Sequence, residues 1–484
     1  MVKTIIAWQV ELDSRNAETT SSVRWALASL ALSVLLSSLG TSIANVALPN
    51  FAEAFNASFQ AVQWIVIAYL LAITTLIVSA GRLGDMIGRR RLLLIGISLF
   101  SLASLLSAVA PTLGLLITAR ALQGLGAAIM MALAMAFVGE TVPKEKTGSA
   151  IGLLGTMSAI ATALGPSLGG VLIAGLSWRA IFLINLPLGA LALVLAHRYL
   201  PVDQRKPKTE RASFDTIGTL LLALTLTAYA LAMTVGRGSF GPLNMALLLA
   251  AFVGAGLFVF AEVRTPSPLI RMAMFRKLEL SASLATSALV STVMMATLVV
   301  GPFYLSQSLG LDAALVGLVL SVGPGVAALS AMPAGRLADR LGTQCVTTVG
   351  LIGMVIGTFT LSLLPTTFGI PGYIACIVVI TASYAFFQTA NNTAVMAGVS
   401  SDQRGAISGM LNLSRNLGLI TGASVMGAVF AFGSASNDIA TASPDAVANG
   451  MQITFAVAAA LLVVALTIAT GANHRFFRNR AIAP

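Results

Sequence analysis

Two arginines interrupt long hydrophobic runs and are the first candidates for chemistry. Arg120 opens the stretch Arg-Ala-Leu-Gln-Gly-Leu-Gly, and Arg415 lies inside the apolar segment 406–432. A guanidinium in hydrocarbon costs at least about 2–3 kcal/mol, so it usually faces a cavity or a partner. An arginine near the end of a run can instead reach the headgroups. We expect Arg120 and Arg415 to act as intramembrane charges in substrate handling or ion coupling.

A glycine-rich, charged octapeptide occurs twice. The run GRLGDMIG at 81–88 returns as GRLADRLG at 335–342, an offset of 254 (335 − 81). Glycines permit a tight turn, and the aspartate can cap a helix or pair with an arginine. Such a cluster can latch one conformation of a moving carrier, although a plain anchored turn would look similar. The predicted gating residues are Gly81, Arg82, Asp85, Gly88, Arg89, Gly335, Arg336, Asp339 and Gly342.

A third motif combines small residues with a proline. It comprises Gly152, Gly165, Pro166, Gly169 and Gly170. Small residues let helices approach closely, and the proline removes a backbone hydrogen bond. A weaker repeat supports duplication at an offset of 257 (405 − 148), aligning Gly148, Gly152, Gly165 and Gly170 with Gly405, Gly409, Gly422 and Gly427.

The elements that carry these motifs are membrane helices. Of the 484 residues 57% are hydrophobic and 9% are charged, and mean hydropathy is +0.92. Soluble domains carry about 25% charged residues, and in lipid only helices or closed barrels satisfy the backbone. Fourteen runs reach the helix-spanning length of about 20 residues. They lie near 25–49, 62–80, 92–110, 113–138, 149–175, 181–200, 215–236, 243–262, 281–308, 313–334, 343–364, 372–398, 406–432 and 451–472.

The charge pattern orients these helices. With the N-terminus in the cytoplasm, almost every basic loop residue falls inside, and only Arg179 and Arg237 remain outside. The positive-inside rule therefore places both termini in the cytoplasm. The net charge of +11 then reflects topology, and we expect no nucleic-acid partner. The loops are too short for a soluble catalytic domain, and no metal-ligand or nucleophile cluster is apparent, so we expect no enzyme, metal or cofactor.

The repeats and the helix count predict an all-α membrane protein of two six-helix bundles related by pseudo-two-fold symmetry. The two offsets indicate a duplicated half, as in alternating-access carriers. Two extra helices fill the surplus between the halves. The predicted divisions are a cytoplasmic tail at 1–24, bundles at 25–200 and 281–472, a two-helix linker at 201–280, and a tail at 473–484.

The three motifs stand in the order and loop positions typical of the major facilitator superfamily, which the chain resembles beyond residue 25. Further stretches resemble its fourteen-helix drug:proton antiporter branch specifically, namely 42–49, 63–69, 178–187, 387–393 and 404–416. The resemblance implies a proton-driven multidrug exporter in the inner (cytoplasmic) membrane, with small amphipathic substrates. Whether a periplasmic adaptor protein takes part stays open.

One departure affects the expected substrate. Where the resembled family usually carries an aspartate in its first helix, this chain has Gly40. No acidic residue falls at a helix midpoint, so the intramembrane charges are both cationic. We therefore expect a preference for neutral or anionic compounds. Proton coupling needs a buried titratable group, for which Glu53, Glu140 and Glu279 are the nearest candidates. Uniport, or an uptake or exchange carrier for a metabolite, stays open.

Polar and aromatic residues of the apolar segments are the candidates for a central substrate cavity. Amides can hydrogen-bond a substrate or only bridge helices, and tyrosines offer stacking surfaces. The predicted cavity residues are Asn45, Tyr69, Gln123, Tyr304, Gln307, Gln388, Asn391 and Asn392.

Overall fold

The computed structural model describes most of the chain. The described residues are 2–141, 147–203, 215–235, 241–265, 278–397, 404–435 and 442–482. Within them, fourteen helical segments are long and apolar enough to cross a membrane. The predicted all-α fold with fourteen spans is confirmed.

The first group of helices covers the N-terminal part of the chain, here called the N-half. The sixth span is divided where the chain turns at Ile184, into a short α7 and a longer α8. The helices are α1 (Val2–Val46), α2 (Leu48–Ala54), α3 (Phe59–Ile87), α4 (Arg89–Val109), α5 (Leu113–Thr141), α6 (Thr147–Gly175), α7 (Ala180–Leu183) and α8 (Asn185–Tyr199).

The second group, here called the C-half, begins at α11. Two π-helical turns interrupt its regular helices, one at Tyr304–Ser308 and one at Gly422–Met426, which the sequence did not predict. The α-helices are α11 (Leu278–Phe303), α12 (Ala313–Leu341), α13 (Thr343–Ser362), α14 (Gly369–Ala397), α15 (Arg404–Thr421), α16 (Gly427–Gly433) and α17 (Pro444–Ile482), with a 3-10 turn at Thr366–Phe368.

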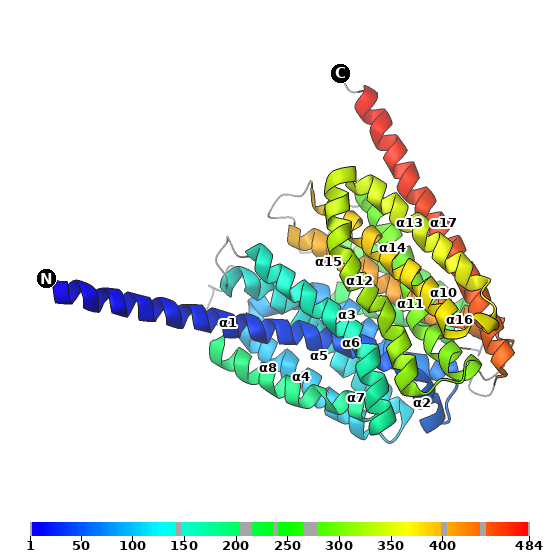
Figure 1. Cartoon of the computed structure of the whole chain (residues 1–484), viewed down its shortest axis with the longest axis horizontal. Helices are drawn as coiled ribbons and strands as arrows, with labels where there is room; N and C mark the ends of the chain where they lie inside the picture. The colour runs from blue at the N-terminus through cyan, green and yellow to red at the C-terminus, as the bar shows by residue number, and fades with distance from the viewer. Residues whose placement is uncertain are drawn as a thin grey trace.

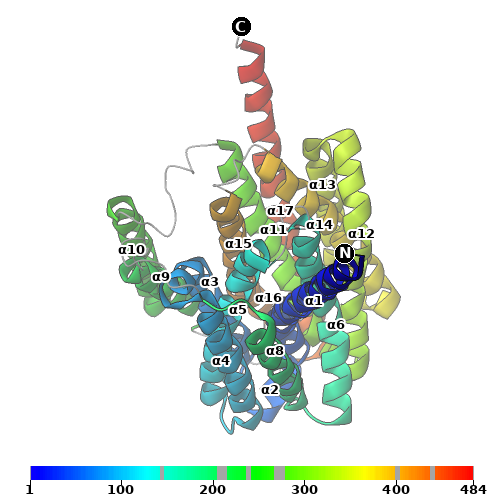
Figure 2. The same cartoon turned by 90° about the vertical axis from the view of Figure 1, so that its left-hand side faces the viewer.

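Between the halves lie α9 (Thr216–Thr234) and α10 (Pro242–Arg264), which pack on each other. Figure 2 shows this pair at one edge of the molecule, beside α3. Trp64 Nε1 of α3 donates to Thr234 Oγ1 of α9 at 3.0 Å, and Tyr229 of α9 donates to Thr421 Oγ1 of α15 at 3.2 Å. The helix α9 therefore contacts both halves.

The first and last helices extend well beyond one membrane thickness. The 45 residues of α1 rise about 68 Å at about 1.5 Å per residue, against a hydrocarbon core of about 30 Å. The candidate span of α1 starts only at Val23, and that of α17 ends at Gly471. The segments expected to be polar tails thus continue the two helices (Figure 1).

The two halves form a wedge in Figure 1. Its open side points toward the chain termini, and we call this the terminal side, at the start of α4 and of α15. The opposite ends of the helices converge. We call this the far side, at the start of α3, the end of α11 and the start of α12.

Candidate functional site

The halves meet on the far side through the glycine–proline motif of α6. A Cβ built on Gly170 would lie 3.0 Å from the Cα of Gly317 on α12 and would overlap the carbonyl of Ala313. A Cβ on Gly317 would lie 3.1 Å from the carbonyl carbon of Pro166. Only residues without side chains allow such a backbone approach. The motif that sequence analysis singled out therefore forms a contact between the halves.

An equivalent contact occurs with the halves exchanged. Gly427 of α16 packs on Gln63 of α3, and Gln63 Nε2 donates to the carbonyl of Ala423 at 2.8 Å. Gly427 follows Gly170 by 257 positions (427 − 170), and Ala423 follows Pro166 by the same number (423 − 166). On the partner helices, Gly317 follows Gln63 by 254 positions (317 − 63). The duplication seen in the sequence thus produces two matching contacts on the far side.

Three phenylalanines pack together beside these contacts. The ring of Phe59 on α3 lies 4.8 Å from that of Phe303 on α11 and 5.3 Å from that of Phe430 on α16, measured between centroids. All three side chains are buried. Together with the glycine contacts they close the far side.

The other side of α6 is held on α1. A Cβ on Gly165 would lie 3.1 Å from the amide nitrogen of Ile43, and one on Gly169 would lie 2.7 Å from Cγ1 of Val46. The helix α6 therefore contacts α1 of its own half and α12 of the other. Gly152 lies in the same helix nearer the terminal side.

Arg120 is enclosed within the N-half. Its side chain is 0% exposed. Its Nε donates to the carbonyl of Ile65 at 3.0 Å, and its two terminal nitrogens donate to the carbonyl of Gly40 at 2.9 Å and to Gln123 Oε1 at 2.5 Å. The guanidinium carbon lies 4.2 Å from the centre of the Tyr69 ring. The guanidinium of Arg120 thus contacts neutral oxygens and the faces of aromatic rings.

The same cluster explains the glycine at position 40. A Cβ there would lie 2.9 Å from the hydroxyl and 3.3 Å from Cζ of Tyr69, and 3.4 Å from Cε2 of Phe100. The Tyr69 hydroxyl in turn donates to the carbonyl of Ser37 at 2.7 Å. Tyr69 therefore fills the space that an acidic side chain would need, and the Gly40 carbonyl takes the position of a hydrogen-bond partner to Arg120.

Arg415, the second predicted intramembrane charge, is half-buried on α15 and not enclosed. Among the described side chains, the buried charged residues are Arg120, Asp215 and Glu262. The sequence predicted the same intramembrane role for both arginines, but their surroundings differ, since Arg120 is enclosed and Arg415 is half-buried.

The two predicted gating turns have similar backbone conformations. Gly88 and Gly342 have φ angles of 108° and 86°, in the region that favours glycine, and each separates two helices. In the N-half, the Asp203 carboxylate accepts from the amides of Arg90 and Arg91 at 2.8 and 3.0 Å, which caps α4. Sequence analysis missed this cap.

The other predicted gating residues lie on the same turns. Gly81 is in α3 and Arg89 begins α4, whereas the side chains of Arg82 and Asp85 lie outside the described part. In the C-half, Gly335 is in α12 and both Arg336 and Asp339 are exposed.

The predicted cavity residues do not gather in one place. Asn45, Tyr69 and Gln123 are buried inside the N-half, where Gln123 Nε2 donates to Ser104 Oγ at 2.7 Å. Tyr304 and Gln307 lie at the far-side π turn after α11. Toward the terminal side of α14, Asn391 is buried, Gln388 is half-buried and Asn392 is exposed. Their contact with substrate stays a prediction.

Buried polar atoms without partners mark the far-side π turn. Among the described residues, the hydroxyls of Tyr304 and Tyr373 and the Oε1 of Gln307 are buried without a hydrogen-bond partner. The two tyrosine rings lie 5.7 Å apart. π turns often occur at functional positions, so this cluster strengthens Tyr304 and Gln307 as candidates.

The acidic residues divide by burial. Glu53 on α2 and Glu279 on α11 are exposed, and the side chain of Glu140 is outside the described part. Asp215 and Glu262, at the terminal-side ends of α9 and α10, are 7% and 2% exposed. A Cβ on Gly218 would lie 2.6 Å from an oxygen of each, so the two carboxylates approach one another. The sequence did not predict the burial of these two carboxylates.

Comparison with known families agrees with this architecture. Residues 30–423 match the Major Facilitator Superfamily. The riboflavin transporter RibZ of Clostridioides difficile is 30% identical over 83% of this chain and 87% of its own length. The multidrug resistance protein Stp of Mycobacterium tuberculosis is 32% identical, over 81% of this chain and 73% of its own. The multidrug efflux pump LfrA of Mycolicibacterium smegmatis is 30% identical, over 84% and 80%.

Solved structures share the fold at low sequence identity. A bacterial homologue of the human lysosomal transporter Spinster, in an inward-facing, unoccupied conformation, superposes with a TM-score of 0.68 at 15% identity, covering 94% of this chain and 98% of its own. A D-xylose–proton symporter gives a TM-score of 0.66 at 16% identity, covering 92% and 97%.

Proposed function

Because the chain belongs to the major facilitator superfamily, we propose that it is an efflux transporter that moves small amphipathic compounds across the inner membrane by alternating access. Two relatives named as multidrug proteins, at 30–32% identity over most of this chain, support export. The observation that carries the proposal is the pair of matching far-side contacts, Gly170 with Gly317 and Gly427 with Gln63. Such a pair can open as a unit when the halves rock.

The membrane orientation follows the distribution of charge. We assign the terminal side to the cytoplasm, since the loops on that side hold nearly all the basic residues. With the far side closed, the described conformation then faces the cytoplasm and is the state that would load an exported substrate. The expected gating turns, at Gly88 and Gly342, lie on this same side.

For the substrate we propose a preference for neutral or anionic compounds. The enclosed Arg120 has neutral partners, and Tyr69 occupies the space beside Gly40. The half-buried Arg415 supplies positive charge on α15. A desolvated cation attracts anions and repels cationic drugs.

For the driving force we propose proton antiport, with Asp215 and Glu262 ahead of Glu53 and Glu279 as coupling groups. A coupling carboxylate must leave bulk water, and the first two are buried whereas the last two are exposed. In inverted vesicles, Asp215→Asn and Glu262→Gln should each abolish pH-gradient-driven uptake. Glu279→Gln is the matched control and should keep it. Full gradient-driven uptake in both buried variants would rule out this assignment.

Growth and vesicle assays test the export proposal. Cells that overproduce the protein should survive higher concentrations of a weak-acid amphiphile than a deletion strain, with little gain against ethidium. A Gly317→Leu variant, which blocks the far-side contact, should behave like the deletion. Strong protection against ethidium would contradict the anion preference but leave export standing.

A metabolite carrier is the second candidate, favoured by the similarity to a riboflavin transporter. Uptake by right-side-out vesicles would support this function, whereas uptake by inverted vesicles would support export. Riboflavin and the weak acid should be compared in both preparations. Transport that persists after the pH gradient is collapsed would indicate a uniporter.

A further inference from the structure

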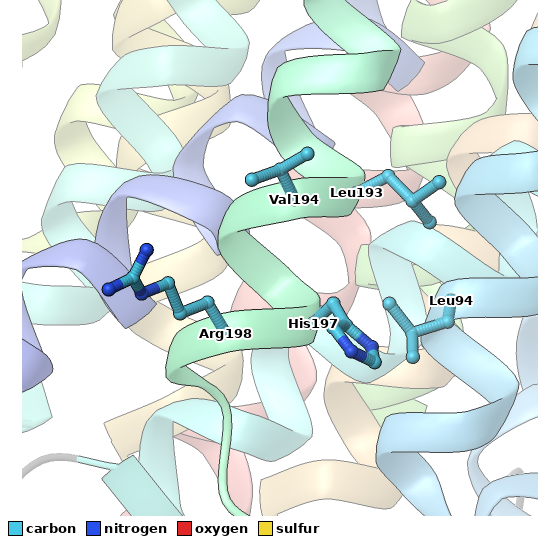
Figure 3. A pocket seen from close by; sticks show the side chains of 5 residues that line it. All are labelled: Leu94, Leu193, Val194, His197 and Arg198. Atoms are coloured by element: carbon cyan, nitrogen blue, oxygen red, sulfur yellow. The ribbon is translucent and has the colours of Figure 1, made fainter.

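An open groove lies on the outer face of the N-half, away from the contact between the halves. It has a volume of ≈ 600 Å³ and is lined by Leu94 of α4 and by Leu193, Val194, His197 and Arg198 of α8. Figure 3 shows Leu94 opposite His197, whereas Arg198 and Val194 extend from the other flank of α8. The groove thus crosses the last turns of α8 and combines aliphatic walls with a basic end.

The basic end is built by two helix termini. A terminal nitrogen of Arg90, at the start of α4, donates to the carbonyl of His197 near the end of α8. Arg90 Nε is buried and has no hydrogen-bond partner among the described residues. Arg91, His197 and Arg198 are exposed. Several cationic groups therefore collect where the aliphatic part of the groove ends.

The Asp203 carboxylate beside this basic end is already hydrogen-bonded. Asp203 accepts from the backbone amides of Arg90 and Arg91, at 2.8 and 3.0 Å, and so caps the α4 N-terminus. Its single charge lies at the backbone of Arg90 and Arg91, and Arg198 adds a further cation to the groove lining. Among the described residues, this region therefore keeps an excess of positive charge that suits an anion.

Aromatic side chains place this basic end at headgroup depth. The Trp25 ring stacks on Tyr199 with centroids 6.1 Å apart, and the guanidinium of Arg198 lies 5.8 Å from the Tyr199 ring. Trp25 is 47% exposed. Tryptophan and tyrosine concentrate at the membrane interface, and basic residues there attract anionic lipids.

We propose that this groove binds one anionic phospholipid from the terminal-side leaflet. Its phosphate lies at Arg198 and Arg90, and an acyl chain runs along Leu94, Leu193 and Val194. A free anion would have no use for the aliphatic wall, and a zwitterionic lipid would leave the positive charge uncompensated. The occupant therefore combines a hydrocarbon chain with a net negative headgroup.

The chain offers a matched control for this site. Arg264, at the terminal-side end of α10, is also exposed and lies 4.0 Å from the ring of Phe260. It shares the helix-end position and the aromatic neighbour of Arg198, but it does not line the groove between α4 and α8.

The test uses the whole protein in nanodiscs that contain lipids with brominated chains. Bromine quenches nearby tryptophan, and the signal of Trp25 is the difference between wild type and Trp25→Phe. Brominated phosphatidylglycerol should half-quench Trp25 at a mole fraction about fivefold lower than brominated phosphatidylcholine. Arg198→Gln should remove that difference, and Arg264→Gln should keep it.

Three outcomes would overturn the proposal. The first is equal quenching by the two lipids in the wild type. The second is an equal loss of the lipid difference in the Arg198 and Arg264 variants. The third is release of phosphatidylglycerol by millimolar inorganic phosphate, which would reveal an anion site without a lipid component. A size-exclusion profile unchanged from wild type verifies that each variant is folded.

Discussion

The two halves share their backbone contacts but not their polar chemistry. Gly96 of α4 packs on α5, and Gly350 of α13, 254 positions later (350 − 96), packs on α14 at Ser383 and Phe387. The predicted gating turns and the far-side contacts repeat in the same way. Yet positions 374–377, at offsets 254–257 from Arg120, are Ile, Ala, Cys and Ile. The features that repeat are therefore those that fix helix approach, whereas the buried charge belongs to one half.

This difference indicates that the two halves have different roles. In the N-half, Arg120 ties α1, α3 and α5 together through the carbonyls of Gly40 and Ile65. In the C-half, the charge on Arg415 is half-buried, and the hydroxyls of Tyr304 and Tyr373 lack partners among the described residues. We infer that the N-half is the more rigid polar scaffold and that the C-half carries the groups free to meet a substrate.

The largest expected effect comes from Arg120→Ala. The change leaves the buried carbonyls of Gly40 and Ile65 without the guanidinium donor, and each buried acceptor left unpaired costs about 1–3 kcal/mol. We expect the protein to accumulate poorly and to unfold at a clearly lower temperature in detergent. Thermal unfolding followed by fluorescence-detected size exclusion measures this.

Arg415→Ala is the contrasting variant. Because Arg415 is half-buried, its removal should leave the unfolding temperature near that of wild type while transport of an anionic compound falls at least tenfold. If the two alanine variants were equally stable, the proposed contrast between scaffold and substrate-facing halves would be wrong.

The fold could largely be predicted from the sequence, whereas the packing of the candidate site could not, for physical reasons. The hydrophobic runs predicted the fourteen spans because a spanning helix has a fixed length. The spacing of the glycines predicted the duplication of the six-helix half. The enclosure of Arg120 was not predictable, since a guanidinium can face a cavity, a partner or the headgroups. The burial of Asp215 and Glu262 depends on how α9 and α10 meet at Gly218, a long-range contact that no local pattern encodes.

The second prediction concerns the two far-side contacts. Gly317→Leu adds a side chain at a position where even a Cβ would lie only 3.0 Å from the Cα of Gly170. The two halves therefore cannot close there. Gln63→Ala removes only one hydrogen bond, worth about 1 kcal/mol. Transport should fall about 100-fold in the first variant and a few-fold in the second.

Spin labels on the far-side ends of α3 and α11 provide the structural readout. Gly317→Leu should lengthen the distance between the labels, and Gln63→Ala should leave the closed distance dominant. A closed distance in Gly317→Leu would mean that these contacts do not control far-side opening.

The third prediction restores a carboxylate beside Arg120. Gly40→Asp alone should destabilise the protein, since Cβ would lie 2.9 Å from the Tyr69 hydroxyl. Gly40→Asp with Tyr69→Ala gives the carboxylate room to pair with the guanidinium. The ratio of ethidium to weak-acid transport should then rise about tenfold over Tyr69→Ala alone. An unchanged ratio would show that Arg120 has no influence on substrate charge.

The smallest effects are expected at the gating turns, where the comparison between halves is most direct. Gly342→Ala meets no atom within 4 Å, so it should cost only the strain of a side chain at φ 86° and ψ 148°, about 1–3 kcal/mol. Gly88→Ala adds a contact of 2.7 Å to Cγ of Asp203 and should displace the cap on α4, worth about 1 kcal/mol more. Adding Asp203→Ala separates the two contributions, because Gly88→Ala should cost less in that background than in wild type. Urea midpoints of Gly342→Ala, Gly88→Ala, Asp203→Ala and the double variant Gly88→Ala/Asp203→Ala measure the coupling. Additive losses in the double variant would exclude Asp203 as the cause of the difference between the turns.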